Sequence, residues 1–147
     1  MMDSWANFAD GAPELAAFGA ARLAGQVAYL ATVRPDGAPR VHPVTPIIGE
    51  GHLFLFMEPT SPKGKDLQRD GRYALHCAVS DSSGASGEFI LSGHARLVTD
   101  SDTRESAKRV SSYAPKDRYV LFELSVENAA STVYEGDGIA RTKWEAE

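Results

Sequence analysis

The sequence predicts a mainly β, mixed α+β fold in which a small antiparallel barrel carries helices on its outside. Five or six segments have the apolar character of strands, and most of them are joined by short turns. Short turns between consecutive strands are typical of antiparallel pairing, because parallel strands need a long crossover connection. Three further segments have helical patterns. The chain has 147 residues with no repeat and no long linker, so we expect one domain over residues 1–147.

The first half of the chain is predicted to hold one helix and three extended segments. Residues 13–25 have the apolar spacing of a short amphipathic helix, with a proline at the first turn and a glycine at the end. A strand over residues 26–34 leads into the turn sequence Pro-Asp-Gly. Residues 38–48 are extended but contain three prolines, which excludes them from the centre of a sheet and predicts an edge, a bulge or backbone that is left free for a ligand. The apolar residues 52–57 predict a buried strand.

The second half is predicted to alternate strands with two helices. The helices are expected over residues 63–70 and 100–114, because each pattern is followed by a glycine or a proline that ends it. Gly93 lies inside a long strand pattern and predicts a bulge or bend there. The strands are expected over residues 72–79, 88–98 and 118–126, with a polar loop at 80–87 and an irregular tail at 135–147.

Charge and composition exclude several classes of protein. The net charge is −5 and the pI is near 5.4, which argues against a general nucleic-acid binder because such proteins need a basic surface. We see no signal-peptide pattern at the N-terminus and no apolar run of membrane-spanning length, so we expect no membrane partner and a cytoplasmic location. The one cysteine, Cys77, lies in an apolar run and is expected to be a buried structural thiol.

The usual catalytic motifs are absent from the sequence. It contains neither the nucleophile elbow of hydrolases nor a P-loop. The four histidines, at 42, 52, 76 and 94, show no metal-binding spacing, so we expect no metal site. His76 and His94 lie in strands and are interpreted as structural, whereas His52 follows a turn and is expected to be solvated.

The segment TSPKGKDL is a candidate anion site. Pro62 suits the first position of a helix, and Ser61 then falls at the N-cap, where its hydroxyl can accept from a free backbone N–H. The helix start is partly positive, and Lys63 and Lys65 add to that field. A phosphate is the natural ligand of such a place. Two solvated surface lysines are the alternative interpretation.

Three segments together resemble a known family. They are YLATVRPDGAPRVHPVTPI, LFLFMEPTSPKGKDL and EFILSGHARL, and their order and spacing resemble the flavin-binding split barrel of the pyridoxamine 5′-phosphate oxidase-like superfamily. The resemblance covers roughly residues 26–100. It implies an antiparallel six-stranded split β-barrel with flanking helices, which binds FMN at the interface of a homodimer.

The resemblance also implies roles for individual residues. The proline-interrupted strand lies along the flavin ring, and the end of the next strand flanks it. The phosphate motif of the family matches Ser61 and Lys63, with Pro62 in place of its arginine and Lys65 as the substitute charge. Glu88 falls where the family reaches the flavin of the partner subunit, and Arg141 matches a C-terminal arginine element. The implied cofactor-binding residues are His42, Pro43, Val44, Thr45, Met57, Glu58, Ser61, Lys63, Lys65, Glu88 and Arg141.

The implied function is that of a flavin-dependent oxidoreductase that transfers hydride to or from a small molecule. No catalytic residue is assigned, because a bound flavin performs the hydride chemistry itself. The loop at 80–87 is shorter than in true pyridoxamine 5′-phosphate oxidases, so we expect that compound to be a poor substrate. Two alternatives stay open: an F420-dependent reductase of the same fold, and a non-enzymatic flavin- or haem-binding protein with His42, His76 or His94 as a candidate iron ligand.

Overall fold

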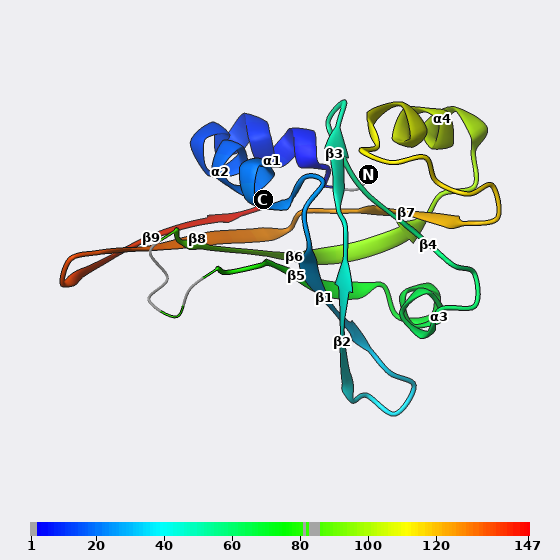
Figure 1. Cartoon of the computed structure of the whole chain (residues 1–147), viewed down its shortest axis with the longest axis horizontal. Coiled ribbons are helices and arrows are strands. Elements are labelled where there is room, and N and C mark those ends of the chain that lie inside the picture. The colour runs from blue at the N-terminus through cyan, green and yellow to red at the C-terminus, as the bar shows by residue number, and fades with distance from the viewer. Residues whose placement is uncertain (1–2, 81, 83–85) are drawn as a thin grey trace.

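The computed structural model describes residues 3–80, 82 and 86–147, and these form one strongly curled antiparallel sheet with helices packed on it (Figure 1). The antiparallel prediction is confirmed, because all eight strand pairings in this part of the chain are antiparallel. The expected number of six strands is too low, since the sheet has nine. The segment 80–87, expected to be a polar loop, lies partly outside the described residues.

The strands cover most of the segments that were predicted to be extended. The helices are α1 (Trp5–Gly11), α2 (Pro13–Leu23), α3 (Pro62–Arg69) and α4 (Ser101–Val110). The strands are β1 (Ala28–Val33), β2 (Pro39–Val44), β3 (Ile47–Gly49), β4 (His52–Met57), β5 (Arg72–Cys77), β6 (Glu88–Leu97), β7 (Val120–Leu124), β8 (Asn128–Glu135) and β9 (Gly138–Glu145).

The sheet curls because β6 changes partners along its length. Its main path runs β2-β1-β5-β6-β7-β4-β3, while β8 pairs with β6 and carries β9 beside it. Residues 88–92 of β6 pair with β8, and residues 95–97 pair with β7. Gly93 lies between them, and a Cβ there would be only 2.5 Å from the backbone oxygen of Ser125. The predicted bend at Gly93 is therefore a place where two backbones approach more closely than any side chain permits.

The proline-rich segment forms an edge, as its sequence predicted. In the described part of the chain, β2 pairs with β1 alone, and a short β3 follows it on the opposite border of the sheet. Three prolines that cannot donate to a ladder are tolerated in this arrangement. One border of β2 is thus left free beside the start of α3.

Helix α1 was not predicted from the sequence. Ser4 caps this helix by accepting from the backbone N–H of Asn7 at 3.2 Å. Its Trp5 and Phe8 are buried, and Phe8 packs against Phe89 with ring centroids 6.4 Å apart. A helix of 7 residues is too short to show a clear apolar period. Its packing on the core therefore decides its formation.

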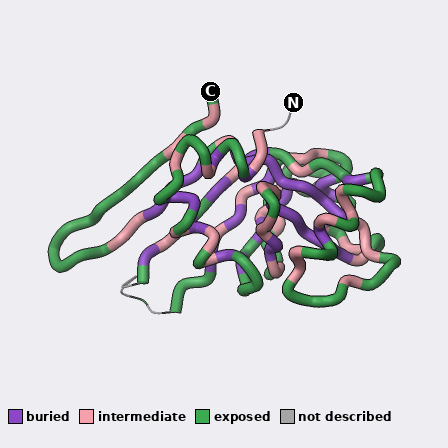
Figure 2. The backbone as a smooth tube through the Cα atoms, turned by 90° about the horizontal axis from the view of Figure 1, so that it is seen from above, coloured by how far each residue is buried: buried purple, intermediate pink, exposed green. Residues whose placement is uncertain are grey.

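The C-terminal region is a hairpin and not an irregular tail. The strand at 118–126 is followed by β8 and β9, which turn at Gly136 with a φ of 56°. Almost every residue of β9 is exposed, so backbone pairing rather than burial holds it in place. Figure 2 shows this hairpin as an exposed arm that projects from the buried centre of the molecule.

The core lies between the sheet and helices α1 and α2, and a smaller cluster lies under α4. Cys77 is buried as expected, and its sulfur accepts a hydrogen bond from the backbone N–H of Phe89 at 3.3 Å. Among the described residues, no helix combines the length and apolar character that crossing a bilayer requires. The largest fully buried side chains are Phe8, Phe54, Phe89, Phe122, Leu23, Leu30, Leu53, Leu55, Leu75, Leu91, Leu121 and Leu124.

Candidate functional site

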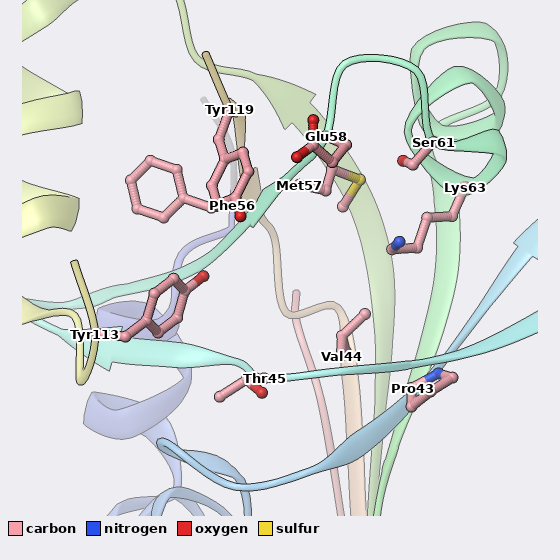
Figure 3. Close-up of a pocket in the computed structure, with 10 residues that line it drawn as sticks. All are labelled: Pro43, Val44, Thr45, Phe56, Met57, Glu58, Ser61, Lys63, Tyr113 and Tyr119. Carbon is pink, nitrogen blue, oxygen red and sulfur yellow. The ribbon is translucent and has the colours of Figure 1, made fainter. Parts of the chain in front are cut away.

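An open cleft of about 470 Å³ lies where the ends of β2 and β4 meet the start of α3 and the loop before β7 (Figure 3). One end of the cleft is polar and the other is aromatic. Seven of the residues that the sequence placed at a cofactor come together here. The lining residues are Pro43, Val44, Thr45, Phe56, Met57, Glu58, Ser61, Lys63, Tyr113 and Tyr119.

The polar end is the N-terminus of α3, built as the sequence predicted. Ser61 is the N-cap, and its Oγ accepts from the backbone N–H of Gly64 at 3.1 Å. Pro62 occupies the first turn, where its missing N–H costs nothing. The helix start therefore presents a partial positive charge to the cleft.

The ammonium group of Lys63 points into the cleft from this helix start (Figure 3). Burial lowers the pKa of Lys63, because water solvates its charge less well there. Among the described residues, no carboxylate lies within ion-pair distance of it. Lys63 is thus a half-buried cation without a protein partner, which is the arrangement expected of a residue that binds an anion.

Asp66 holds α3 against the sheet beneath the cleft. Its carboxylate is 2% exposed and accepts hydrogen bonds from Thr32 Oγ1 on β1 at 2.8 Å and from Arg40 Nε on β2 at 2.7 Å. Burial disfavours the charged form, but the hydrogen bonds from Arg40 and Thr32 outweigh it and keep the pKa of Asp66 below its ordinary value. The role of Asp66 was not predicted from the sequence.

The middle of the cleft is apolar and tightly built. Val44 and Thr45 lie on one side and Met57 on the other (Figure 3). A Cβ at Gly64 would be 3.1 Å from the sulfur of Met57, so the glycine lets α3 approach β4. This region lies between two strand ends and adjoins the cation of Lys63.

The aromatic end of the cleft was not predicted. Tyr113 and Tyr119 come from the loop between α4 and β7, and Phe56 comes from β4. The nearest signal in the sequence was that two tyrosines lie close to a predicted helix end, which by itself gives no indication of where they point. Their place in the cleft follows from the return of the chain into β7.

Glu58 lies on the rim of the cleft with its charge already paired. Arg118 Nε lies 2.9 Å from one carboxylate oxygen of Glu58 and 3.1 Å from the other. These bonds lower the pKa of Glu58, the side-chain hydrogen bond from Arg118 being the main cause. Because the pair is neutral overall, Lys63 sets the charge of the cleft.

Four residues that the sequence placed at the cofactor do not line the cleft of this chain. Lys65 is exposed, because a step of two residues on a helix turns its side chain away from the face that carries Lys63. His42 is exposed next to Pro43. Partial desolvation of its ring, together with the charges of Lys63 and Arg40, lowers the pKa of His42. The other two are Glu88 and Arg141, which lie on β6 and β9 at the opposite end of the sheet.

The expectation that His52 is solvated is wrong. Its Nδ1 lies 2.6 Å from a carboxylate oxygen of the buried Glu123, since the turn before β4 directs the ring onto β7. His76 and His94 are held as expected, with Nδ1 2.6 Å from the oxygen of Cys77 and 2.7 Å from Glu127 respectively. In the part of the chain that the structure describes, no three histidine, cysteine or acidic side chains form a metal-binding group.

Residues 14–133 match the pyridoxamine 5′-phosphate oxidase family. The chain belongs to this family. The match spans most of the chain, from the start of α2 to β8, and includes every residue that lines the cleft. No curated protein sequence matches the chain.

Solved structures share the fold of this family member at low sequence identity. A heme-binding protein from Mycobacterium smegmatis superposes with a TM-score of 0.66 at 20% identity, over 86% of this chain and 55% of that one. The chain thus spans about half the length of that protein. The heme storage protein HutZ from Vibrio cholerae gives 0.56 at 16% identity, over 79% and 89% of the two chains. An F420 reductase gives 0.57 at 16% identity, over 75% and 94%.

Proposed function

We propose that this member of the pyridoxamine 5′-phosphate oxidase family binds FMN in the cleft and acts as an oxidoreductase on a small molecule. The observation that carries the proposal is the half-buried, unpaired Lys63 beside a capped helix start. A phosphate satisfies both the ammonium group and the helix N-terminus. The family to which the chain belongs includes oxidoreductases, which supports the same assignment.

The shape of the cleft fits the rest of that cofactor. Next to Lys63, the side chains of Val44 and Met57 lie on opposite sides of the cleft and would give a flat ring apolar contacts on both of its faces. The free border of β2 offers backbone groups to polar atoms on the edge of such a ring. When bound, FMN supplies the hydride chemistry, while Ser61 and Lys63 hold its phosphate and the strand ends orient its ring.

A homodimer is part of the proposal. Alternate residues of β1, β2, β5 and β6 form an outer sheet face that points away from the core. This face exposes Tyr29 at 45%, Val41 at 65% and Ile90 at 42%. Apolar exposure of this extent is typical of an interface with a second copy. Glu88 and Arg141 lie far from the cleft of their own chain, so they contact a cofactor only across such a dimer.

The two alternatives each have a structural relative but fit this cleft less well. F420 has a longer acidic tail than FMN, and Lys63 is the one cation among the residues that line the cleft. The histidines that are the candidate iron ligands of the heme alternative, His42, His76 and His94, do not line the cleft. We therefore favour FMN over F420 and over heme. We also expect pyridoxamine 5′-phosphate to be a poor substrate.

The test is a titration of FMN and of riboflavin, which lacks the phosphate, into wild type and Lys63→Ala. We expect FMN binding to weaken about 10- to 100-fold in the variant, since one charge-assisted hydrogen bond contributes about 1.5–3 kcal/mol. Riboflavin binding should be unchanged. Lys65→Ala is the matched control, because it removes an equal charge two positions along the same helix but outside the cleft. Equal affinity of Lys63→Ala and wild type for FMN would refute the phosphate site.

A further inference from the structure

The end of the cleft away from Lys63 carries two tyrosine hydroxyls. Figure 3 shows the hydroxyls of Tyr113 and Tyr119 pointing into the same part of the cleft, next to the ring of Phe56. Burial and the nearby Tyr119 raise the pKa of Tyr113. This phenol therefore keeps its proton at neutral pH and acts as a hydrogen-bond donor.

Neither hydroxyl is used by the fold. The hydrogen bonds of these two residues come from their backbone N–H groups, which donate to Ser111 Oγ and to the oxygen of Lys116. Within residues 3–80, 82 and 86–147, no protein group accepts from either phenol. Two donors directed into one region of an open cleft, without protein acceptors, are available to a ligand.

The aromatic rings themselves are held from outside the cleft. The guanidinium carbon of Arg118 lies 5.6 Å from the ring centroid of Tyr119, and the same side chain binds Glu58. The guanidinium carbon of Arg104 lies 5.2 Å from the ring centroid of Phe56. Contacts of this kind stabilise the rings in place. The aromatic end is therefore a preformed surface.

We propose that Tyr113 and Tyr119 bind the substrate by donating hydrogen bonds to a carbonyl oxygen on a flat conjugated ring at the aromatic end of the cleft. The inference rests on the proposed oxidoreductase function and names the substrate class for the same cleft. A carbonyl oxygen has two lone pairs and can accept from two converging phenols. The aromatic wall provides the packing surface for the ring. A phosphate or carboxylate is drawn instead to Lys63 at the opposite end.

The experiment compares two flat bicyclic probes, coumarin with a ring carbonyl and naphthalene without one. Equilibrium dialysis in the presence of excess FMN, which keeps the probes out of the proposed flavin site, gives their affinities for wild type, Tyr113→Phe, Tyr119→Phe and the double variant. We expect the double variant to bind coumarin about 3- to 10-fold more weakly, because a neutral hydrogen bond has a modest net value. Its affinity for naphthalene should not change, because both rings are retained.

Two outcomes would overturn this proposal: coumarin bound equally well by wild type and double variant, or coumarin bound no more tightly than naphthalene by wild type. A thermal unfolding curve that matches wild type shows that a weaker affinity does not reflect misfolding. An FMN titration of the same variants separates the two proposals. A wild type that binds coumarin through its tyrosines but does not bind FMN would refute the FMN function alone.

Discussion

Asp66 and Lys63 lie on the same short helix, but their charges have different surroundings. Asp66 is almost fully buried and is satisfied by Thr32 and Arg40, which lie on two neighbouring strands. Lys63 is half-buried and faces the open cleft. The paired charge fixes the position of α3, and the unpaired charge is left for a ligand.

Removing the charge of Asp66 should lower the free energy of unfolding of the whole protein. Asp66→Asn leaves Arg40 without its carboxylate, and loss of one partner from a buried pair costs about 3 kcal/mol. Urea unfolding of wild type and variant measures this difference. A change below about 0.5 kcal/mol would show that this pair does not anchor α3.

The same residue predicts a dependence of stability on pH. The folded-state pKa of Asp66 lies below its ordinary value of 3.8, so its charged form stabilises the fold above that pH. This contribution is lost as the pH falls through the folded-state pKa. Between about pH 5 and pH 3, the free energy of unfolding should fall more steeply for wild type than for Asp66→Asn. Parallel curves for the two proteins would contradict the assignment.

Helix α3 has a structural cap and the proposed phosphate site in its first turn. The hydroxyl of Ser61 stabilises the helix by accepting from Gly64, and the same residue lines the cleft. A short helix of 8 residues depends strongly on such a cap and on its packing. A negatively charged side chain at position 61 can still cap the helix but repels a bound anion. Such a substitution therefore separates capping from anion binding.

Ser61→Asp should keep the stability of the fold but lose affinity for FMN. Aspartate is as good an N-cap as serine, but its charge repels a phosphate held by Lys63. Ser61→Ala should instead lower the free energy of unfolding by about 1 kcal/mol. Thermal unfolding and FMN titration of both variants check this. FMN binding by Ser61→Asp at the affinity of wild type would place the phosphate elsewhere.

At the scale of the whole molecule, the outer sheet face is the main unexplained surface. The strands β1, β5 and β6 bury one set of alternating side chains in the core and expose the other set, whereas β2 buries none of its side chains. Tyr29, Val41 and Ile90 lie on the exposed side. A second copy of the chain packed on this face would bury them and bring Glu88 toward a cofactor site.

A charge on this face should prevent dimer formation. Ile90→Glu places a carboxylate where we propose apolar contact, so sedimentation at micromolar concentration should change from dimer to monomer. Leu97→Glu is the matched control, because Leu97 is 37% exposed on the same strand but its side chain points to the other face. A monomeric wild type, or an Ile90→Glu variant that remains dimeric, would refute this interface.

The sequence by itself determined the class of fold and named seven of the ten residues that line the cleft. Turn residues and apolar runs predict strands joined by short connections, and therefore antiparallel pairing, because both act over a few residues. The Ser61 cap, the Pro62 helix start and the position of Lys63 were readable for the same reason, since capping is local chemistry. The edge position of β2 followed from its prolines.

The tertiary structure decided the rest, because those features depend on partners far away in the chain. Strand β9 has no apolar period of its own and forms by pairing with β8. Asp66 anchors α3 only through its hydrogen bonds to Thr32 and Arg40, which come 34 and 26 residues earlier in the chain. Tyr113 and Tyr119 reach the cleft because the loop before β7 returns to the end of β4. Local patterns in a sequence do not indicate which distant segments the curled sheet brings together.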